Sequence, residues 1–467
     1  MTTPHPQVSF PFASDDEEED CCSVVLSVLD KQQLCLHAAS LHQRLYGTLS
    51  TPLIGDAMHG SYNICLPLTF NNGFRWIARF PFSGIKGRWN ELCAAALESE
   101  AKTMTFLKLE TTVPLPEVLD FCTTLENPLG CPFIIMTFIS GLLLGDAWFQ
   151  EDADAEVVHR SRTRALEGIA SAMAQLSRFT FPTGGSPVFK NDGTIDPSQT
   201  RSLRLYDQLA LLEGAGEDMV YKECPAYSNP KHYYTFMLDK HPTTNEYVMG
   251  RQALLRQLIS WIPEPVAKGE NAFVLAHPDL DMQNIIVNEA GEVQGIIDWD
   301  GVAAMPLSCG NERYPLWLTN EWDDYERPHL ADKNKDEDDK EKRDDRAKSN
   351  AQYRAIYRDL LRKATNSVQQ QNKTKRKRRS RDRAIRAASK NICRASFIAS
   401  NLAIAVSTPL LEHEILANLV HEAWAVEGRE GNEPWMSDLC AIALGKEKNP
   451  AVMQTLRSGF LKLLYKD

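Results

Sequence analysis

The stretch 273–306 constrains the fold of this 467-residue chain more than any other. Within it, the apolar runs 285–287 and 293–297 flank the short turn sequence Asn-Glu-Ala-Gly. Two apolar runs around a turn that contains glycine are typical of a β-hairpin. Asn284 precedes the first predicted strand and Asp298 follows the second. The hairpin should therefore bring these two polar side chains close together.

A third apolar run, Phe273 to Ala276, precedes this hairpin and leads into His277 and Asp279. Phosphoryl transfer from ATP requires an Asp that accepts the hydroxyl proton, and an Asn and a second Asp that hold Mg²⁺ against the phosphates. The kinase catalytic loop places four residues between that Asp and the Asn, with the metal-binding Asp downstream. Asp279, Asn284 and Asp298 fit this spacing. The alternative is a surface hairpin that carries incidental acidic residues.

The order His-x-Asp-x-x-x-x-Asn, followed by Ile-Ile-Asp-Trp-Asp, closely resembles the aminoglycoside phosphotransferase family within the protein kinase-like fold. It is also similar to choline and homoserine kinase-type small-molecule kinases. The resemblance implies an α+β, two-lobed fold with a small antiparallel-sheet N-lobe and a mainly helical C-lobe. It implies that Asp279 is the catalytic base, that Asn284 and Asp298 bind Mg²⁺, and that His277 braces the catalytic loop without reacting.

The segment around Gly60 is the candidate phosphate-binding turn. Gly60, Ser61 and Asn63 precede a predicted strand that ends near Leu68. Backbone N–H groups in such a turn can bind phosphate where no bulky side chain obstructs them. A plain hairpin entry is the alternative, since one glycine replaces the usual glycine-rich loop.

Arg79 and Glu100 are expected to form the second part of the nucleotide site. Arg79 lies on the predicted strand 74–80, at the position where the resemblance places a phosphate-binding Lys. Arg is also cationic, but its planar fork differs from the ammonium group of Lys. The resemblance pairs Arg79 with Glu100, which lies on the predicted helix 90–110. A solvated helix Glu is the alternative.

The buried run Phe133 to Met136 predicts a strand, and the segment after it, with Thr137 and Ile139, is the expected hinge between the lobes. Backbone groups there would hydrogen-bond adenine. A strand and turn without a ligand remains the alternative. An amphipathic helix is predicted from Val157 to Phe179, behind the catalytic loop, and residues 182–197 are expected to form a loop.

The resulting domain organisation has five parts. We expect a disordered acidic tail, a nucleotide-binding lobe, a catalytic lobe, a charged insertion or linker, and C-terminal helices that pack on the catalytic lobe: 1–20, 21–136, 137–330, 331–394 and 395–467.

Composition limits the partners and the location. The net charge of −11 argues against a general nucleic-acid binder. The eleven cysteines show no metal-type spacing, so we expect reduced thiols in the cytoplasm. The most apolar late stretch, 397–411, is too short to cross a membrane. The acidic run Asp15–Asp20 could bind a protein partner, and the basic run Lys373–Arg381 could do so or direct nuclear import.

The sequence therefore predicts an enzyme that phosphorylates a small-molecule hydroxyl with ATP and Mg²⁺. Two alternatives stay open. A pseudokinase scaffold would bind nucleotide or a protein partner without catalysis, and Arg79 favours it. A protein kinase is a weaker alternative, because no Ala-Pro-Glu segment follows Asp298.

Overall fold

The computed structural model describes residues 23–60, 62–150, 154–206, 221–241, 243–263, 271–322, 337–373 and 381–465. The acidic run Asp15–Asp20, Ser61 and residues 374–380 of the basic run lie outside the described residues. The chain divides into two compact units. The first comprises residues 1–140, 191–194 and 204–223, and the second comprises 141–190, 195–203 and 224–467.

The first unit is built on one antiparallel sheet of six strands. Its order is β1-β3-β4-β6-β5, and β2 also pairs with β3. The strands are β1 (Leu53–Ile54), β2 (Met58–His59), β3 (Asn63–Thr69), β4 (Arg75–Pro81), β5 (Val118–Cys122) and β6 (Phe133–Thr137). The β3–β4 pair is a regular hairpin, because Gly73 adopts φ 86° in the turn.

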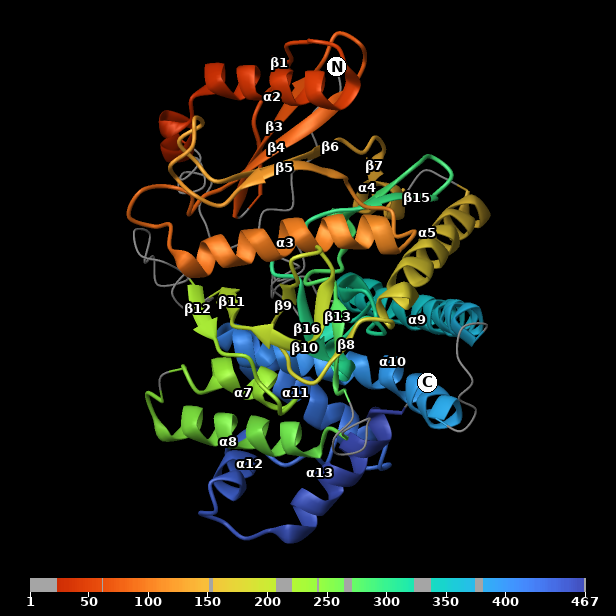
Figure 1. Cartoon of the computed structure of the whole chain (residues 1–467). Helices are drawn as coiled ribbons and strands as arrows, with labels where there is room; N and C mark the ends of the chain where they lie inside the picture. Colours follow the sequence, from red (N-terminus) through yellow and green to blue (C-terminus); the bar gives the residue numbers. More distant parts are fainter. Residues whose placement is uncertain are drawn as a thin grey trace. The chain divides into compact units, whose positions relative to one another are not determined.

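Side-chain alternation gives this sheet two different faces. Ile64, Leu66 and Ala78 are buried on one face, which is covered by the apolar side of α2 (Lys31–Tyr46). The opposite face carries Arg79, which pairs with Glu100 of α3 (Glu91–Glu110). Figure 1 shows α3 on this side of the sheet. The side chain of Asn90 accepts a hydrogen bond from Cys93 N and so caps the start of α3.

The second unit contains three small sheets and most of the helices. The sheets have the orders β16-β13-β8, β15-β14-β7 and β10-β9. Their strands are β7 (Leu142–Leu143), β8 (Thr180–Phe181), β9 (Ser186–Phe189), β10 (Ile195–Arg201), β13 (Phe273–Ala276), β14 (Ile285–Val287), β15 (Val293–Ile296) and β16 (Ala303–Pro306). A further pair, β11 (Leu203–Tyr206) with β12 (Tyr221–Cys224), lies where the chain passes between the units.

Helix α5 (Ala155–Leu176) overlaps the helix predicted at 157–179 and packs against β13 and β15. Gly168 lies so close to Val293 that an added Cβ would approach its side chain to 2.7 Å. At Gly291, in the turn of the β14–β15 hairpin, a Cβ would lie 2.4 Å from Ser161 O on α5, and φ is 81°. Both glycines thus allow the hairpin to pack directly against this helix.

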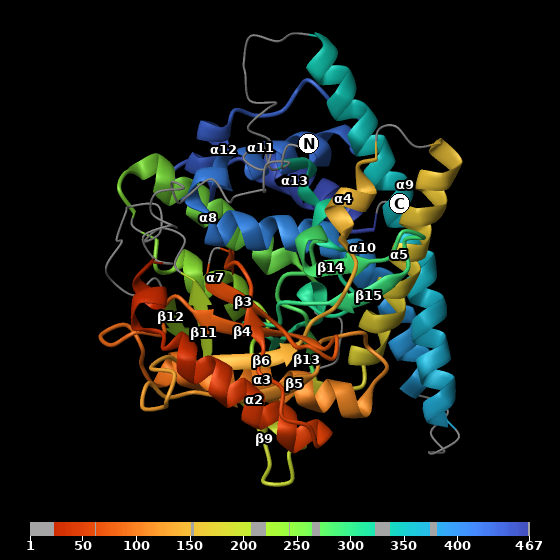
Figure 2. The ribbon, with the colours of Figure 1, turned by 90° about the horizontal axis from the view of Figure 1, so that it is seen from above.

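Part of the segment 331–394, expected as a charged insertion or linker, is helical. Residues 337–373 form α9 (Glu337–Lys373), which lies beside α5 in Figure 2. Tyr353 and Tyr357 are buried on α9, and Tyr353 packs edge-on against Trp148 at 5.1 Å. The prediction relied on the charge density near 331–348, whereas the aromatic residues that follow attach this helix to the second unit.

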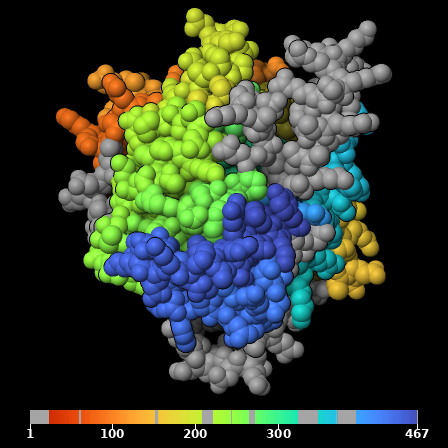
Figure 3. Space-filling view, turned by 90° about the horizontal axis from the view of Figure 1, so that it is seen from below, coloured from red at the N-terminus to blue at the C-terminus, as the bar shows by residue number. Residues whose placement is uncertain are grey.

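The C-terminal helices share a core with α7 (His232–Leu238) and α8 (Glu246–Trp261). They are α10 (Arg381–Ser407), α11 (Pro409–Ala425), α12 (Met436–Ala443) and α13 (Pro450–Leu463). Figure 3 shows the green segment with α7 and α8 adjacent to the blue C-terminal helices on one face. This packing agrees with the prediction that the fold resumes after the insertion.

The prediction of a loop at 182–197 was wrong, because β9 lies within this range and β10 begins in it, and the two strands pair antiparallel. In the part of the chain that the structure describes, no disulfide links the cysteines, and no helix is long and apolar enough to span a membrane. The two units together have the predicted α+β organisation, an antiparallel-sheet unit followed by a mainly helical one.

Candidate active site

The hairpin predicted from the sequence is formed and brings Asn284 next to the Asp298 segment. Ile285 pairs with Ile296 across β14 and β15, and Ile297 N donates to Asn284 O at 2.9 Å. Asp298 is the residue immediately after Ile297. The two expected metal ligands are therefore neighbours at the open end of one hairpin.

Asp279 lies in the loop between β13 and this hairpin, and its carboxylate is held by two amides. Gln283 Nε2 donates to Asp279 Oδ2 at 3.0 Å, and Asn284 Nδ2 donates to the same oxygen at 2.8 Å. Both donors engage Oδ2, which makes Oδ1 the atom that can receive a proton. Burial raises the pKa of the Asp279 carboxyl, whereas Arg313 and the two amides oppose that rise.

The orientation of the Asn284 amide follows from its partners. Besides Asp279 Oδ2, its Nδ2 donates to the backbone oxygen of Asp279 at 2.9 Å. Both partners are acceptors, so the amide nitrogen must face them and the amide oxygen must face away. Asn284 is buried, with 5% of its surface exposed. The loop therefore presents Asn284 Oδ1 as an oxygen donor.

Asp298 occupies an unusual backbone conformation. Among the described residues it is the only non-glycine residue with positive φ, at 58°. Asp tolerates this left-handed region better than most residues, although the conformation still costs free energy. The exposed side chain of Asp298 follows two residues after the end of β15. Such strain at the predicted metal ligand is consistent with a functional site.

His277 connects the start of the loop with the end of the hairpin. Its Nε2 donates to Ile297 O at 2.9 Å, and its ring packs edge-on against Trp299 at 4.7 Å. Burial lowers the pKa of His277 to about 3, so the ring is neutral at physiological pH. These contacts are those expected of a residue that braces the loop.

Sequence reasoning missed Gln283 and Arg313. Arg313 is buried, and its Nη2 donates to His277 O at 3.0 Å and to Pro278 O at 2.7 Å. It lies 34 residues after Asp279, and no periodicity links the two.

In the first unit, Gly60 lies in the turn between β2 and β3. Gly60 N donates to Asn63 O at 3.1 Å, which closes the turn. An added Cβ at Gly60 would meet no atom within 4 Å, so the backbone there is open on that side. Ser61 lies outside the described residues. The described part of the turn has the accessible backbone that a phosphate would need.

Arg79 on β4 and Glu100 on α3 form the expected ion pair. Arg79 Nη2 donates to Glu100 Oε2. The exposed fractions of the two residues are 8% and 2%, so this pair is buried. Loss of either partner would leave a buried charge without compensation, which costs stability.

In the expected hinge, Thr137 and Phe138 are hydrogen-bonded to neighbouring segments, whereas, in the part of the chain that the structure describes, Ile139 is not. Thr137 N donates to Glu117 O at 2.9 Å, and Thr137 Oγ1 accepts from Glu117 N at 2.9 Å. Phe138 N donates to Arg75 O, and the Arg75 guanidinium lies 3.7 Å from the Phe138 ring centroid. No hydrogen bond within the described residues involves Ile139. Ile139 is therefore better placed than Thr137 to bind a base through its backbone.

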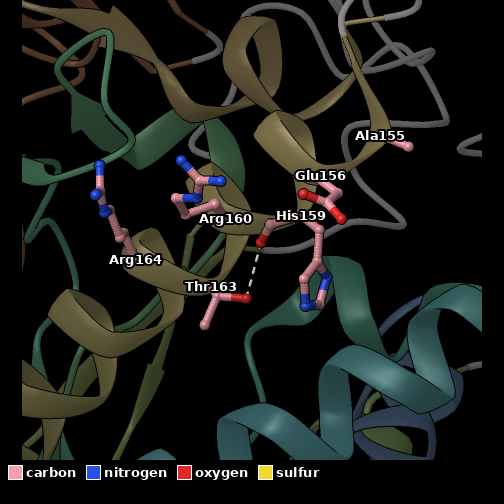
Figure 4. Close-up of a pocket in the computed structure, with 6 residues that line it drawn as sticks. All are labelled: Ala155, Glu156, His159, Arg160, Thr163 and Arg164. Atoms are coloured by element: carbon pink, nitrogen blue, oxygen red, sulfur yellow. Dashed lines mark hydrogen bonds between the residues drawn. The ribbon is translucent and has the colours of Figure 1, made fainter.

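The surface of helix α5 carries a hollow. It has a volume of about 540 Å³ and is lined by Ala155, Glu156, His159, Arg160, Thr163 and Arg164. Figure 4 shows these side chains on successive turns of the helix, with Thr163 Oγ1 donating to His159 O at 2.8 Å. None of the predicted site residues lines it.

The donor set fits a magnesium ion. Within the described ranges, no group of three His, Cys, Asp or Glu side chains could hold a metal alone. Asn284 Oδ1 and the Asp298 carboxylate are hard oxygen donors, and Mg²⁺ commonly uses one or two protein ligands and takes the rest from phosphates and water. The residues present are therefore sufficient for a Mg²⁺–nucleotide complex.

Comparison with known proteins places the chain in a family. The model described as the phosphotransferase enzyme family matches residues 69–309, just over half of the chain. The chain belongs to the phosphotransferase enzyme family. The match contains Arg79, Glu100, Asp279, Asn284 and Asp298. The predicted family is thereby confirmed for this phosphotransferase, and the α+β organisation of its two units agrees with the predicted fold class.

Two curated relatives are similar to parts of the chain. A subtelomeric hrmA-associated cluster protein of Aspergillus fumigatus is 26% identical over 315 residues, which covers 55% of this chain and 58% of the relative. The mitochondrial altered inheritance of mitochondria protein 9 of Candida tropicalis is 30% identical over 139 residues, which covers 30% of this chain and 22% of the relative. The chain thus spans little more than half the length of the first relative.

Among solved structures, a thermostable mutant of aminoglycoside phosphotransferase APH(4)-Ia in a ternary complex with AMP-PNP and hygromycin B is 14% identical. The alignment covers 90% of this chain and 98% of that chain, with a TM-score of 0.38. A Plasmodium vivax ethanolamine kinase is 11% identical, with coverage of 96% and 99% and a TM-score of 0.37. The assignment to the phosphotransferase family rests on the sequence match over residues 69–309.

Proposed function

We propose that this phosphotransferase transfers the γ-phosphoryl group of ATP to a hydroxyl group of a small molecule, with Asp279 as the catalytic base. The observation that carries the proposal is the arrangement of the catalytic loop. Two amides hold Asp279 Oδ2, so Oδ1 is left to accept a proton. The same Asn284 amide turns its oxygen away from Asp279, which leaves that oxygen as a possible metal ligand.

In the proposed reaction, Asp279 Oδ1 accepts the proton of the acceptor hydroxyl. The hydroxyl oxygen bonds to the γ-phosphorus, the bond from that phosphorus to the bridging oxygen breaks, and ADP leaves with the electron pair. Burial raises the pKa of Asp279, and a base is most effective when its pKa lies near the working pH. His277, neutral and buried, does not exchange the proton in this scheme.

The remaining predicted residues would bind the nucleotide. Asn284 and Asp298 would hold Mg²⁺, which when bound neutralises charge on the phosphate oxygens. Arg79, oriented by Glu100, would contact the α- and β-phosphates, and the turn of Gly60, Ser61 and Asn63 would cover them. The backbone of Ile139 in the expected hinge would hydrogen-bond adenine.

A nucleotide-binding scaffold without catalysis is the second candidate. It is favoured by Arg79, which stands where the resemblance places Lys. The guanidinium cannot reproduce the compact charge of a lysine ammonium group. This candidate predicts ATP binding without any phosphorylated product.

The proposal is tested by measuring ATP binding and turnover in the same preparation. Calorimetric titration with ATP, with Mg²⁺ or with a chelator, should show affinity that depends on the metal and is lost in Asp298→Ala. A screen of hydroxyl compounds for ADP release should then identify an acceptor for the wild type. Metal-dependent binding without turnover for any acceptor would favour the scaffold, and no binding at all would contradict both candidates.

A further inference from the structure

The guanidinium group of Arg313 holds the backbone of the catalytic loop immediately before Asp279. Its Nη2 atom donates to His277 O at 3.0 Å and to Pro278 O at 2.7 Å. We propose that Arg313 is a positioning residue that fixes the path of this loop and thereby the direction of the Asp279 carboxylate. The inference rests on the proposed function for its catalytic consequence, but the structural part can be tested without it.

The segment that carries Arg313 is itself anchored to the body of the second unit. Asn311 Nδ2 donates to Met173 O on α5 at 2.9 Å, and Tyr314 N donates to Ser396 Oγ on α10 at 2.9 Å. Ser396 is fully buried. An arginine set between two such anchors can act as a fixed support, since its own backbone is held on both sides.

The segment passes close to β13 at Gly310, and after Arg313 it contacts the catalytic loop a second time. A Cβ at Gly310 would lie 2.4 Å from Val274 Cγ1 on β13, so the segment passes β13 closely only because this residue is glycine. Farther along, Leu316 N donates to Leu280 O at 3.0 Å. The loop is thus attached to one segment on both sides of Asp279, at 277–278 and at 280.

Hydrogen exchange of the full-length chain tests the positioning role without any need for turnover. Three amides report on the loop: Asp281 N, Met282 N and Asn284 N, which donate to Asp279 O, Asp281 Oδ1 and Asp281 O. In Arg313→Met, exchange in peptides spanning 277–284 should rise at least about tenfold, because hydrogen bonds from a charged buried group are lost. Exchange in the β14–β15 strands should change less.

Arg354→Met is the matched control. Arg354 also donates to a backbone carbonyl, Leu318 O at 2.5 Å, and pairs with Glu321, but neither partner belongs to the catalytic loop. This variant should leave exchange at 277–284 unchanged. If Arg313→Met does not fold, Arg313→Lys carries the test, because Lys keeps the charge but has a shorter reach and lacks the planar guanidinium fork. Hydrogen exchange at 277–284 should rise less in Arg313→Lys than in Arg313→Met.

Turnover measurements add a second readout. In Arg313→Met, kcat should fall at least about tenfold, while KM for ATP changes less than about twofold, because the base is misplaced and the nucleotide ligands remain. A purely structural role would lower the free energy of unfolding without this selective fall in kcat.

The outcomes separate this inference from the proposed function. Loop exchange that rises in Arg313→Met, in a wild-type protein without turnover, would support the positioning role and contradict the phosphotransfer reaction. An active wild type whose loop exchange and kcat are both unchanged in Arg313→Met would overturn the positioning role alone. An equal rise of exchange at 277–284 in Arg354→Met would also overturn it.

Discussion

Asn284 Nδ2 lies 2.8 Å from Asp279 Oδ2, so the predicted metal ligand and the predicted base are joined by a direct hydrogen bond. Because the amide nitrogen serves the base, the amide oxygen is directed away from it. The nitrogen of the Asn284 amide contacts the base and its oxygen is the proposed metal ligand, and a substitution can test these two roles separately.

Asn284→Asp should separate them. The variant keeps an oxygen ligand but replaces a donor to Asp279 with a second carboxylate, which raises the pKa of the pair by like-charge repulsion. We expect Mg²⁺-dependent ATP binding to persist while turnover falls by at least about tenfold. Asn288→Asp, at the turn of the same hairpin, adds the same charge as a control. Turnover at the wild-type level in Asn284→Asp would contradict the assigned contact.

Substitutions of Asp298 can separate the effect of its backbone conformation from the effect of its carboxylate. Asn tolerates positive φ, so Asp298→Asn should change the free energy of unfolding by less than about 0.5 kcal/mol, whereas Asp298→Ala should cost about 1 kcal/mol or more. Both variants should lose the Mg²⁺-dependent increase in melting temperature that ATP produces. Chemical denaturation and melting curves measure the two effects. A full metal-dependent shift in Asp298→Asn would argue against a metal ligand at this position.

The Arg79–Glu100 pair should behave differently in single and double variants. Arg79→Met or Glu100→Leu alone leaves a buried charge without compensation and should cost about 3–5 kcal/mol of stability. The double variant should recover most of that loss, because two apolar side chains can replace a buried pair. ATP affinity, measured by calorimetry, should nevertheless remain low in the double variant. Wild-type affinity there would show that the pair is only structural.

His277 should make stability depend on pH. Its pKa is about 3 in the folded protein and near 6.5 when unfolded. As the pH falls below about 6.5, the unfolded state binds a proton that the folded state does not, so stability falls down to about pH 3. His277→Gln can still donate from Nε2 but does not titrate. Between about pH 7 and pH 5, the wild type should lose about 2 kcal/mol more than this variant.

Equal losses in the wild type and in His277→Gln would contradict the neutral, buried state of His277. Denaturant titrations at each pH provide the comparison. His277 contacts Ile297 O and the Trp299 ring, and the charged group that acts on it is Arg313, which keeps its charge across this range.

The sequence was sufficient for features that depend on local order. Spacing and apolar flanks predicted the β14–β15 hairpin, and the position of Asp298 after it was confirmed. The helix expected at 90–110 is α3, and its Glu100 does meet Arg79. In each case the interacting residues belong to adjacent strands or to a strand and the next helix, so local patterns determine their contact.

Contacts between distant segments were not predictable in this way. Arg313 reaches the carbonyls of His277 and Pro278 only after Gly310 has passed β13 and two anchors have fixed the segment. The charge-rich segment near 340 suggested a linker, but the helix it begins is attached through Tyr353 and Tyr357. Such contacts depend on tertiary packing, which periodicity and composition do not encode.

The measurement that tests the central claim most directly is the rate of phosphorylated product formation from ATP and an acceptor found by the hydroxyl screen. It should compare the wild type, Asp279→Asn and the surface control Asp239→Asn, whose carboxylate pairs with Arg256. If Asp279 is the base, Asp279→Asn should lower kcat by about 10²–10⁴-fold with intact ATP binding, and the control should match the wild type. Undiminished product formation by Asp279→Asn would contradict the account.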